Sequence, residues 1–169
     1  MFQFEINKSV GNNKTIYVYP TTEAFFKEGN NTYIQNLRRH LNSHFTIINS
    51  PTKIGLLDIL LNLYKTDVIY FNWIEDIPDR KYGFVQLYFF QLLLFLSKLY
   101  DVKIIWFIHN NISHSSKNLN QKKKVISIMR KYSDLILSHS NEIKFVVPRD
   151  KFYFFHHPLD FYKPSDTVK

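Results

Sequence analysis

The sequence contains no cysteine. Its absence excludes disulfide bonds, thiolate nucleophiles and cysteine-ligated metal sites. The chain also lacks internal repeats and low-complexity segments, and its first residues, Met1–Glu5, lack the basic-then-apolar layout of a signal peptide. We therefore expect the 169 residues to form one domain with a single large core, in the cytoplasm.

No apolar stretch is long enough to predict a membrane span. The longest, Phe84–Tyr100, is interrupted by glutamine, serine and lysine, and its purely apolar part is shorter than the roughly 20 residues that a spanning helix needs. We expect a buried helix here, with an exposed interface as the alternative. The segment Ile54–Tyr64 is apolar nearly all round, and we expect that helix to be deeply covered.

Acidic residues are in deficit: 22 Lys and Arg stand against 14 Asp and Glu, giving a net charge of +8. This balance favours an anionic partner, which could be nucleic acid, the anionic inner leaflet or a phosphate-bearing substrate. Nucleic-acid binding would need basic residues interleaved with exposed aromatic ones. Most aromatic residues here fall inside predicted strands and helices, so we expect no nucleic-acid partner.

What the sequence does contain is a series of short apolar runs that end in polar residues. Lys103–Ile108 is one such run, and it stops at His109, Asn110 and Asn111. A continuous apolar run predicts a strand buried on both faces, as in a parallel sheet. Similar runs occupy residues 14–19, 45–48, 67–71, 134–137 and 151–155.

Helical segments alternate with these runs. We expect helices at residues 33–41, 54–64, 84–100, 118–132 and, as a short one, 141–146. Strands that alternate with helices of this length predict right-handed crossovers. The fold class is therefore α/β, a three-layer α/β/α Rossmann-like domain with a mostly parallel sheet of about six strands.

In such a sheet, ligands bind beyond the carboxyl ends of the strands. Four histidines, His109, His139, His156 and His157, fall at these ends, and His114 follows one. The alternative reading is that strand ends are polar because they meet solvent. Adjacent residues of a strand point to opposite faces, so His156 and His157 make a poor chelate, and we expect no metal site.

The ordered set of strand-end segments resembles the N-terminal half of a family-four glycosyltransferase with the GT-B fold. The resembling segments are residues 29–37, 67–73, 104–110, 133–140 and 157–158. One departure is the loop Pro20–Glu23, because many relatives carry a glycine pair there that lets backbone amides approach the donor phosphates.

The resemblance implies that residues 1–158 form the acceptor-binding domain and that residues 159–169 begin an interdomain linker. The C-terminal donor domain is then absent, and the chain alone is expected to be inactive. The whole enzyme would be a hexosyltransferase-type enzyme of cell-surface polysaccharide synthesis. It would use a nucleotide-sugar as co-substrate, no cofactor, and a glycan or polyprenyl-linked acceptor. The alternative is a stand-alone, non-catalytic α/β ligand-binding module.

His109 is the candidate catalytic residue. Its imidazole could orient an acceptor hydroxyl or stabilise charge near the transferred sugar, as the resemblance implies, or it could simply be a buried histidine bonded to a backbone carbonyl. Trp73 could be a platform for a sugar ring or could cover the core edge. Glu75 is a candidate base or a solvated loop residue, and Ser140 could instead cap a helix. The candidate acceptor- or substrate-binding residues are Asn110, Asn72, Trp73, Glu75, Thr21, Thr22, Tyr33, His114, His139 and Ser140.

The clustered lysines allow a further expectation. The run Lys122–Lys124 predicts a solvated helix face, or alternatively contact with an anionic membrane, together with Arg80 and Lys81. Each cation close to such a surface contributes about 1 kcal/mol. With support from Tyr82, Phe84 or Tyr88, we expect salt-sensitive, peripheral binding at the inner membrane face.

Overall fold

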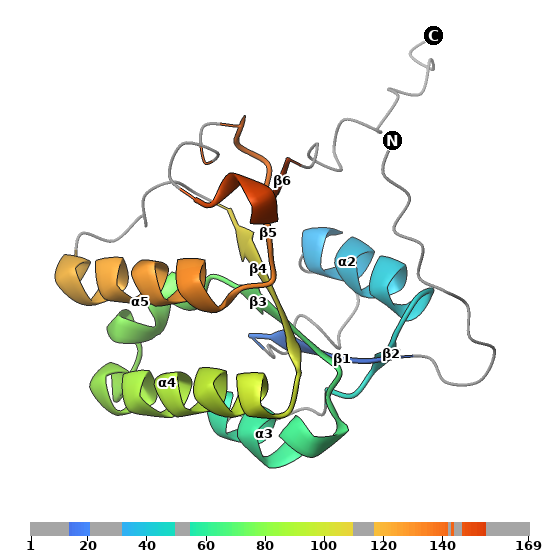
Figure 1. Cartoon of the computed structure of the whole chain (residues 1–169), viewed down its shortest axis with the longest axis horizontal. Coiled ribbons are helices and arrows are strands. Elements are labelled where there is room, and N and C mark those ends of the chain that lie inside the picture. Colours follow the sequence, from blue (N-terminus) through green and yellow to red (C-terminus); the bar gives the residue numbers. More distant parts are fainter. Residues whose placement is uncertain are drawn as a thin grey trace, which may run out of the picture.

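The computed structural model describes residues 14–20, 32–49, 55–109, 117–141, 143 and 147–154. Six parallel strands form one sheet in the order β2-β1-β3-β4-β5-β6 (Figure 1). Their bounds are β1 Thr15–Tyr19, β2 Thr46–Ile47, β3 Val68–Asn72, β4 Lys103–Ile108, β5 Leu135–Ser138 and β6 Phe152–Phe154. The predicted α/β fold with six parallel strands is confirmed.

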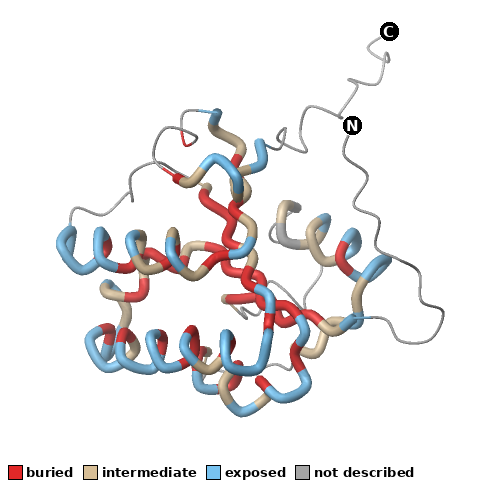
Figure 2. The backbone as a smooth tube through the Cα atoms, in the orientation of Figure 1, coloured by how far each residue is buried: buried red, intermediate tan, exposed pale blue. Residues whose placement is uncertain are grey.

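The helices lie on both faces of the sheet. Of those described, α2 (Thr32–Asn42) packs on one face, while α3 (Leu56–Asn62), α4 (Gly83–Leu99) and α5 (Leu119–Tyr132) pack on the other (Figures 1 and 2). Short 3-10 turns complete the set: η1 Leu63–Lys65, η2 Ile74–Asp79 and η4 Arg149–Lys151. The short helix predicted at 141–146 lies largely outside the described residues.

The central strand β3 shows why apolar runs mark the sheet. All five of its residues are buried. Ile69 and Phe71 pack with α3, α4 and α5, whereas Val68 and Tyr70 pack with α2, because successive side chains alternate between the two faces. A strand covered on both faces needs apolar residues at every position, and this produces the continuous run.

The prediction that the helices at 54–64 and 84–100 are buried is wrong for one side of each helix. On α4, the stripe that includes Leu87 and Phe90 is buried, but Phe84 is 67% exposed and Leu99 is 69% exposed. Leu61 of α3 is also exposed. The sheet covers only one stripe of a helix, so residues that are apolar all round leave an apolar outer face. Among the described helices, none is long and apolar enough to cross a membrane.

The lysine run at the start of α5 does not form a uniformly solvated face. Lys123 and Lys124 are exposed, but the side chain of Lys122 is only 3% exposed. Its Nζ lies 2.5 Å from Asp79 Oδ2 and 3.5 Å from Asp76 Oδ1. The expectation fails for Lys122 because η2 places two carboxylates over the first turns of α5.

Candidate functional site

The candidate site lies at the carboxyl edge of the sheet, where β3, β4 and β5 end side by side. Asn72 is the last residue of β3, His109 directly follows β4, and His139 directly follows β5. Because β3, β4 and β5 are parallel neighbours, these residues meet at one edge. All three occupy alternate positions that face α2, in line with Tyr70, Phe107 and Leu137.

The side chain of Asn72 is hydrogen-bonded to residues of β1 and α2 and to the residue that follows β4. It is fully buried, and its Nδ2 donates a hydrogen bond to the backbone oxygen of Tyr19 at 3.3 Å. That bond directs Oδ1 towards α2, where it accepts a hydrogen bond from the hydroxyl of Tyr33 at 3.2 Å. Oδ1 also lies 3.1 Å from Nε2 of His109.

The bond to Asn72 fixes the tautomer of His109. An amide oxygen only accepts hydrogen bonds, so Nε2 of His109 must carry the proton. In the neutral ring the lone pair is then on Nδ1, the nitrogen that can accept a proton or a hydrogen bond. Asn72 is thus the residue that orients the imidazole.

Aromatic rings enclose His109. The Trp73 indole stacks on the imidazole, with ring centroids 4.2 Å apart and an interplanar angle of 9°. Tyr33 meets the imidazole edge-on at 4.9 Å, and Phe107 lies at 4.5 Å. The cluster therefore offers flat apolar surface beside hydrogen-bonding atoms.

Trp73 holds an unusual backbone conformation to reach this position. Its φ of 47° and ψ of 34° lie in the left-handed region. A bulky non-glycine residue rarely adopts this region, and such strain persists only where the surroundings over-determine it. The stack on His109 and the start of η2 at Ile74 both constrain the residue.

His139 and Ser140 complete the β5 side of the edge. The His139 ring lies 4.7 Å from Phe107 and 6.3 Å from His109. The backbone N–H of Ser140 donates to the hydroxyl of Ser138, which in turn donates to the Ile108 backbone oxygen. His139 therefore faces the cluster, and Ser138 and Ser140 tie β5 to the end of β4.

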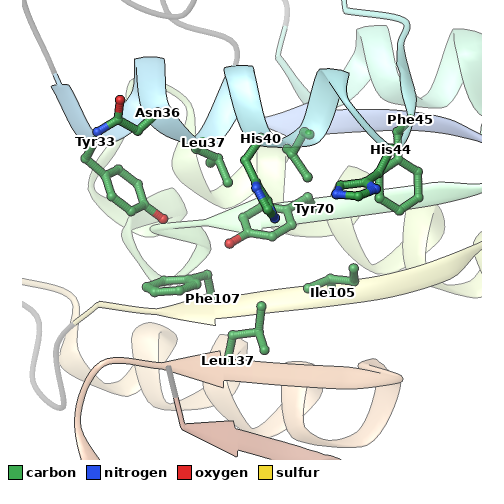
Figure 3. Close-up of a pocket in the computed structure, with 11 residues that line it drawn as sticks. Tyr33, Asn36, Leu37, His40, His44, Phe45, Tyr70, Ile105, Phe107 and Leu137 are labelled. Carbon is green, nitrogen blue, oxygen red and sulfur yellow. The ribbon is translucent and has the colours of Figure 1, made fainter. Parts of the chain in front are cut away.

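An apolar pocket of about 500 Å³ continues from this cluster beneath α2 (Figure 3). Tyr33 and Phe107 belong to both, and the pocket runs along β4 to Ile105 and Phe45 at its other end. The polar side chains in its lining include His40, His44 and Asn36, which come from α2 and the turn after it. Burial raises the pKa of Tyr33 and of Tyr70, so both phenols remain neutral hydrogen-bonding groups.

Glu75 lies apart from the imidazole cluster. It is 7% exposed and lies near Trp106 and Lys122, on the side of the sheet that α3, α4 and α5 cover. Burial, with a smaller contribution from Asp76, raises the pKa of Glu75 to about 7, against the opposing charge of Lys122. Within the described part of the chain, its Oε2 has no hydrogen-bond partner.

The structure thus brings together five of the predicted residues: Asn72, Trp73, His109, Tyr33 and His139. Four others, Thr21, Thr22, Asn110 and His114, lie outside the described residues, as do His156 and His157. The sequence analysis missed Phe107 and the pocket residues His40 and His44. Phe107 stands two positions before His109 and so shares its face, a signal that strand periodicity contains. Among the described residues, no cluster of three His, Asp or Glu side chains could hold a metal ion.

No protein-family model and no curated protein matches the chain. Among solved structures, the chain is similar to the crystal structure of Anabaena Alr3699/HepE in complex with UDP and glucose. The TM-score is 0.49 and the sequence identity 11%, and the match covers 92% of this chain and 48% of that one. The chain therefore spans about half the length of that solved chain.

Proposed function

We propose that this chain is the acceptor-binding half of a glycosyltransferase. The whole enzyme would transfer a hexose from a nucleotide-sugar to a glycan or lipid-linked acceptor, in cell-surface polysaccharide synthesis. The observation that carries the proposal is the Asn72–Trp73–His109 cluster at the carboxyl edge of a parallel sheet, the position where this fold class binds ligands. The sequence resemblance implies a donor domain, and in the proposed enzyme residues after the linker at 159–169 would form it.

His109 has the role of holding the acceptor hydroxyl. The imidazole of His109, which its bond to Asn72 orients, would accept the hydrogen bond of that hydroxyl and take its proton. In the transfer, the hydroxyl oxygen forms a bond to the anomeric carbon of the donor sugar. The bond from that carbon to the diphosphate oxygen breaks, and the nucleoside diphosphate leaves with the electron pair.

The apolar pocket supports a lipid-linked or otherwise apolar acceptor. Its volume falls within the range of about 300–1,000 Å³ that small-molecule sites occupy. Because Tyr33 and Phe107 border both pocket and cluster, an acceptor could place its sugar beside His109 and its apolar part beneath α2. Such an acceptor is carried in a membrane, and we propose that the protein works at the cytoplasmic face of that membrane.

The first test uses the 169-residue chain and a panel of alkyl glycosides, with saturation-transfer NMR as the measurement. We expect binding that Asn72→Ala and His109→Ala each weaken by about tenfold or more, since each removes a hydrogen bond that the site needs. Lys123→Ala, an exposed residue of α5, is the matched control and should bind as the unaltered chain does. Equal binding by all variants would remove the assigned site.

The second test uses the whole enzyme, assayed with a panel of nucleotide-sugars and lipid-linked acceptors. Turnover should be lost in His109→Ala, and turnover that survives this substitution would remove His109 from the reaction.

A stand-alone ligand-binding module is the second candidate. It is favoured by the pocket beneath α2, which residues of this single domain line. The gene distinguishes the two candidates. A reading frame that continues past Lys169 into another α/β domain favours the transferase, whereas a stop codon there favours the binding module.

A further inference from the structure

The outer side of α4 and α3 carries a continuous group of exposed apolar side chains, which we call the α3–α4 face. Its principal members are Leu61, Phe84, Tyr88, Leu92, Phe95 and Leu99. On α4 these residues recur every three or four positions, so they form one stripe opposite the buried stripe of Leu87 and Phe90. The two helices are packed side by side (Figure 1), and Leu61 of α3 is also exposed.

The face is too apolar to be ordinary surface. Single exposed apolar residues are common, but contiguous patches of this kind mark contacts with proteins or membranes. Phe84 and Phe95 are both more than half exposed. The surrounding charge bears on which kind of partner such a face suits.

The charges around the face are cationic. From Arg80 to Tyr100 there is no acidic residue. Lys81 precedes α4, and Lys98 in its last turn is paired with Asp134 at 2.8 Å, just as the exposed Asp101 is paired with Lys103. Asp58, the acidic residue of α3, is buried and bonded to Tyr17. In a two-fold dimer this face would meet a second copy of the same cations, whereas an anionic surface complements them.

Two exposed tyrosines flank the helices of the face, and each has a lysine side chain over its ring. Tyr64 ends the α3 side and Tyr82 precedes α4, and both are exposed. Lys65 Nζ lies 5.0 Å from the ring centre of Tyr64, and Lys81 Nζ lies 5.1 Å from that of Tyr82. Tyrosine and lysine around a phenylalanine and leucine centre match the depth profile of a lipid interface, where amphipathic tips stay at the headgroups.

We propose that the α3–α4 face docks on an anionic lipid bilayer, with α4 lying parallel to the membrane surface. The cations that contribute are Lys65 and Lys81. Lys122 is excluded because it is buried against Asp79, and Lys98 because it is paired with Asp134. Arg80 keeps its charge, but its Nη1 donates a hydrogen bond to the Tyr19 hydroxyl, which directs the side chain towards the sheet. That bond ties the segment before α4 to the end of β1, at the carboxyl edge of the sheet, whereas the candidate site lies on the opposite face of the sheet, beneath α2. The inference is independent of the proposed transferase function, because docking needs no sugar.

Cosedimentation of the full chain with vesicles tests the proposal. The vesicles contain equal parts of phosphatidylcholine and phosphatidylglycerol, and the controls contain phosphatidylcholine alone. We expect binding to the anionic vesicles at low salt that weakens as salt is raised, because exposed charges are screened. Binding to the neutral vesicles should be weaker throughout.

Two sets of variants separate the apolar from the ionic contribution. Phe84→Ser with Phe95→Ser should lower the partition coefficient by about tenfold or more, because two large apolar side chains no longer leave water. Lys65→Glu with Lys81→Glu should abolish the preference for anionic vesicles. Leu119→Ser with Tyr153→Ser is the matched control, since both residues are exposed and apolar but belong to α5 and β6, and it should bind normally.

Circular dichroism should show that all variants are folded, since every altered side chain is exposed. Three results would overturn the proposal. They are no binding at low salt, binding that salt does not change, and binding that the double phenylalanine variant retains. Analytical ultracentrifugation provides a fourth: a dimer that the same variant dissociates would assign the face to a second copy of the chain.

Discussion

The indole of Trp73 and the imidazole of His109 lie almost parallel, with their centres 4.2 Å apart. The two residues follow different strands, β3 and β4, and are joined only because these strands are parallel neighbours. The stack covers one face of each ring, so a ligand could use only the other face of the indole. Ring orientation at this edge therefore depends on both strand ends together.

The amide of Asn72 is expected to control the tautomer of His109. Asn72→Ala removes the acceptor for both Tyr33 and Nε2 of His109 and the donor to the Tyr19 carbonyl. Buried groups left unpaired should lower the free energy of unfolding by about 1–3 kcal/mol. Denaturant titration gives the stability, and nitrogen NMR of the imidazole should show Nε2–H in the unaltered chain and a mixed tautomer in the variant.

Asn36→Ala serves as the control for that substitution. Asn36 is an exposed asparagine of α2 and should change the free energy of unfolding by less than about 0.5 kcal/mol. If the unaltered chain carries the proton on Nδ1 of His109, the assigned bond to Asn72 Oδ1 is wrong.

At position 73, a glycine substitution should destabilise the protein less than an alanine substitution, which reverses the usual order. Both Trp73→Ala and Trp73→Gly lose the stack on His109, but only alanine keeps a Cβ in the left-handed conformation at φ 47°. Glycine adopts that conformation without steric cost, so Trp73→Gly should be more stable than Trp73→Ala by about 1 kcal/mol. Thermal and denaturant unfolding of the pair decides the matter, and an alanine variant at least as stable as the glycine variant would show that this conformation imposes no strain.

Lys122 and Lys123 are adjacent but should respond very differently to substitution. Lys122→Met leaves Asp76 and Asp79 without their buried cation and should lower the free energy of unfolding by about 2 kcal/mol or more. Lys123→Met alters an exposed side chain and should change it by less than about 0.5 kcal/mol. Equal effects in denaturant titrations would mean that the ion pairs with η2 contribute nothing to stability.

Sequence reasoning locates the strands because the physics is local. A strand covered on both faces must be apolar at every position, and β3 and β4 satisfy this over their buried lengths. The same reasoning places Asn72, His109 and His139 at one edge, since parallel strands end together. Strand alternation further places them on the face that α2 covers.

Tertiary pairing explains what the sequence reasoning missed. Nothing local distinguishes Lys122 from Lys123, because the carboxylates that bury Lys122 come from η2, more than a helix away along the chain. An apolar helix such as α4 does not reveal which of its stripes the sheet will cover. His40 and His44 lie in and just after α2 and do not follow a strand, so only the folded position of α2 brings them to the pocket.

Glu75 should make the stability of the protein depend on pH. An unperturbed glutamic acid has a pKa of 4.5, and burial raises the pKa of Glu75 in the folded chain to about 7. Below pH 4.5 both the folded and the unfolded chain hold this proton. Between these two pKa values only the folded chain holds it, so the free energy of unfolding falls as pH rises, and above about pH 7 the fall is complete.

Glu75→Gln isolates this contribution, because glutamine has nearly the same shape and does not ionise. Each pKa unit corresponds to about 1.4 kcal/mol, so the variant should be more stable than the unaltered chain by roughly 3 kcal/mol at pH 8 and nearly equal to it at pH 4.5. Denaturant titrations at a series of pH values give the difference between the two proteins, in which all other titrating groups cancel. Asp101→Asn, at an exposed carboxylate, should show no comparable gain at pH 8. A difference between Glu75→Gln and the unaltered chain that stays constant from pH 4.5 to 8 would mean that the pKa of Glu75 is the same in the folded and the unfolded chain, despite the burial of Glu75 near Trp106.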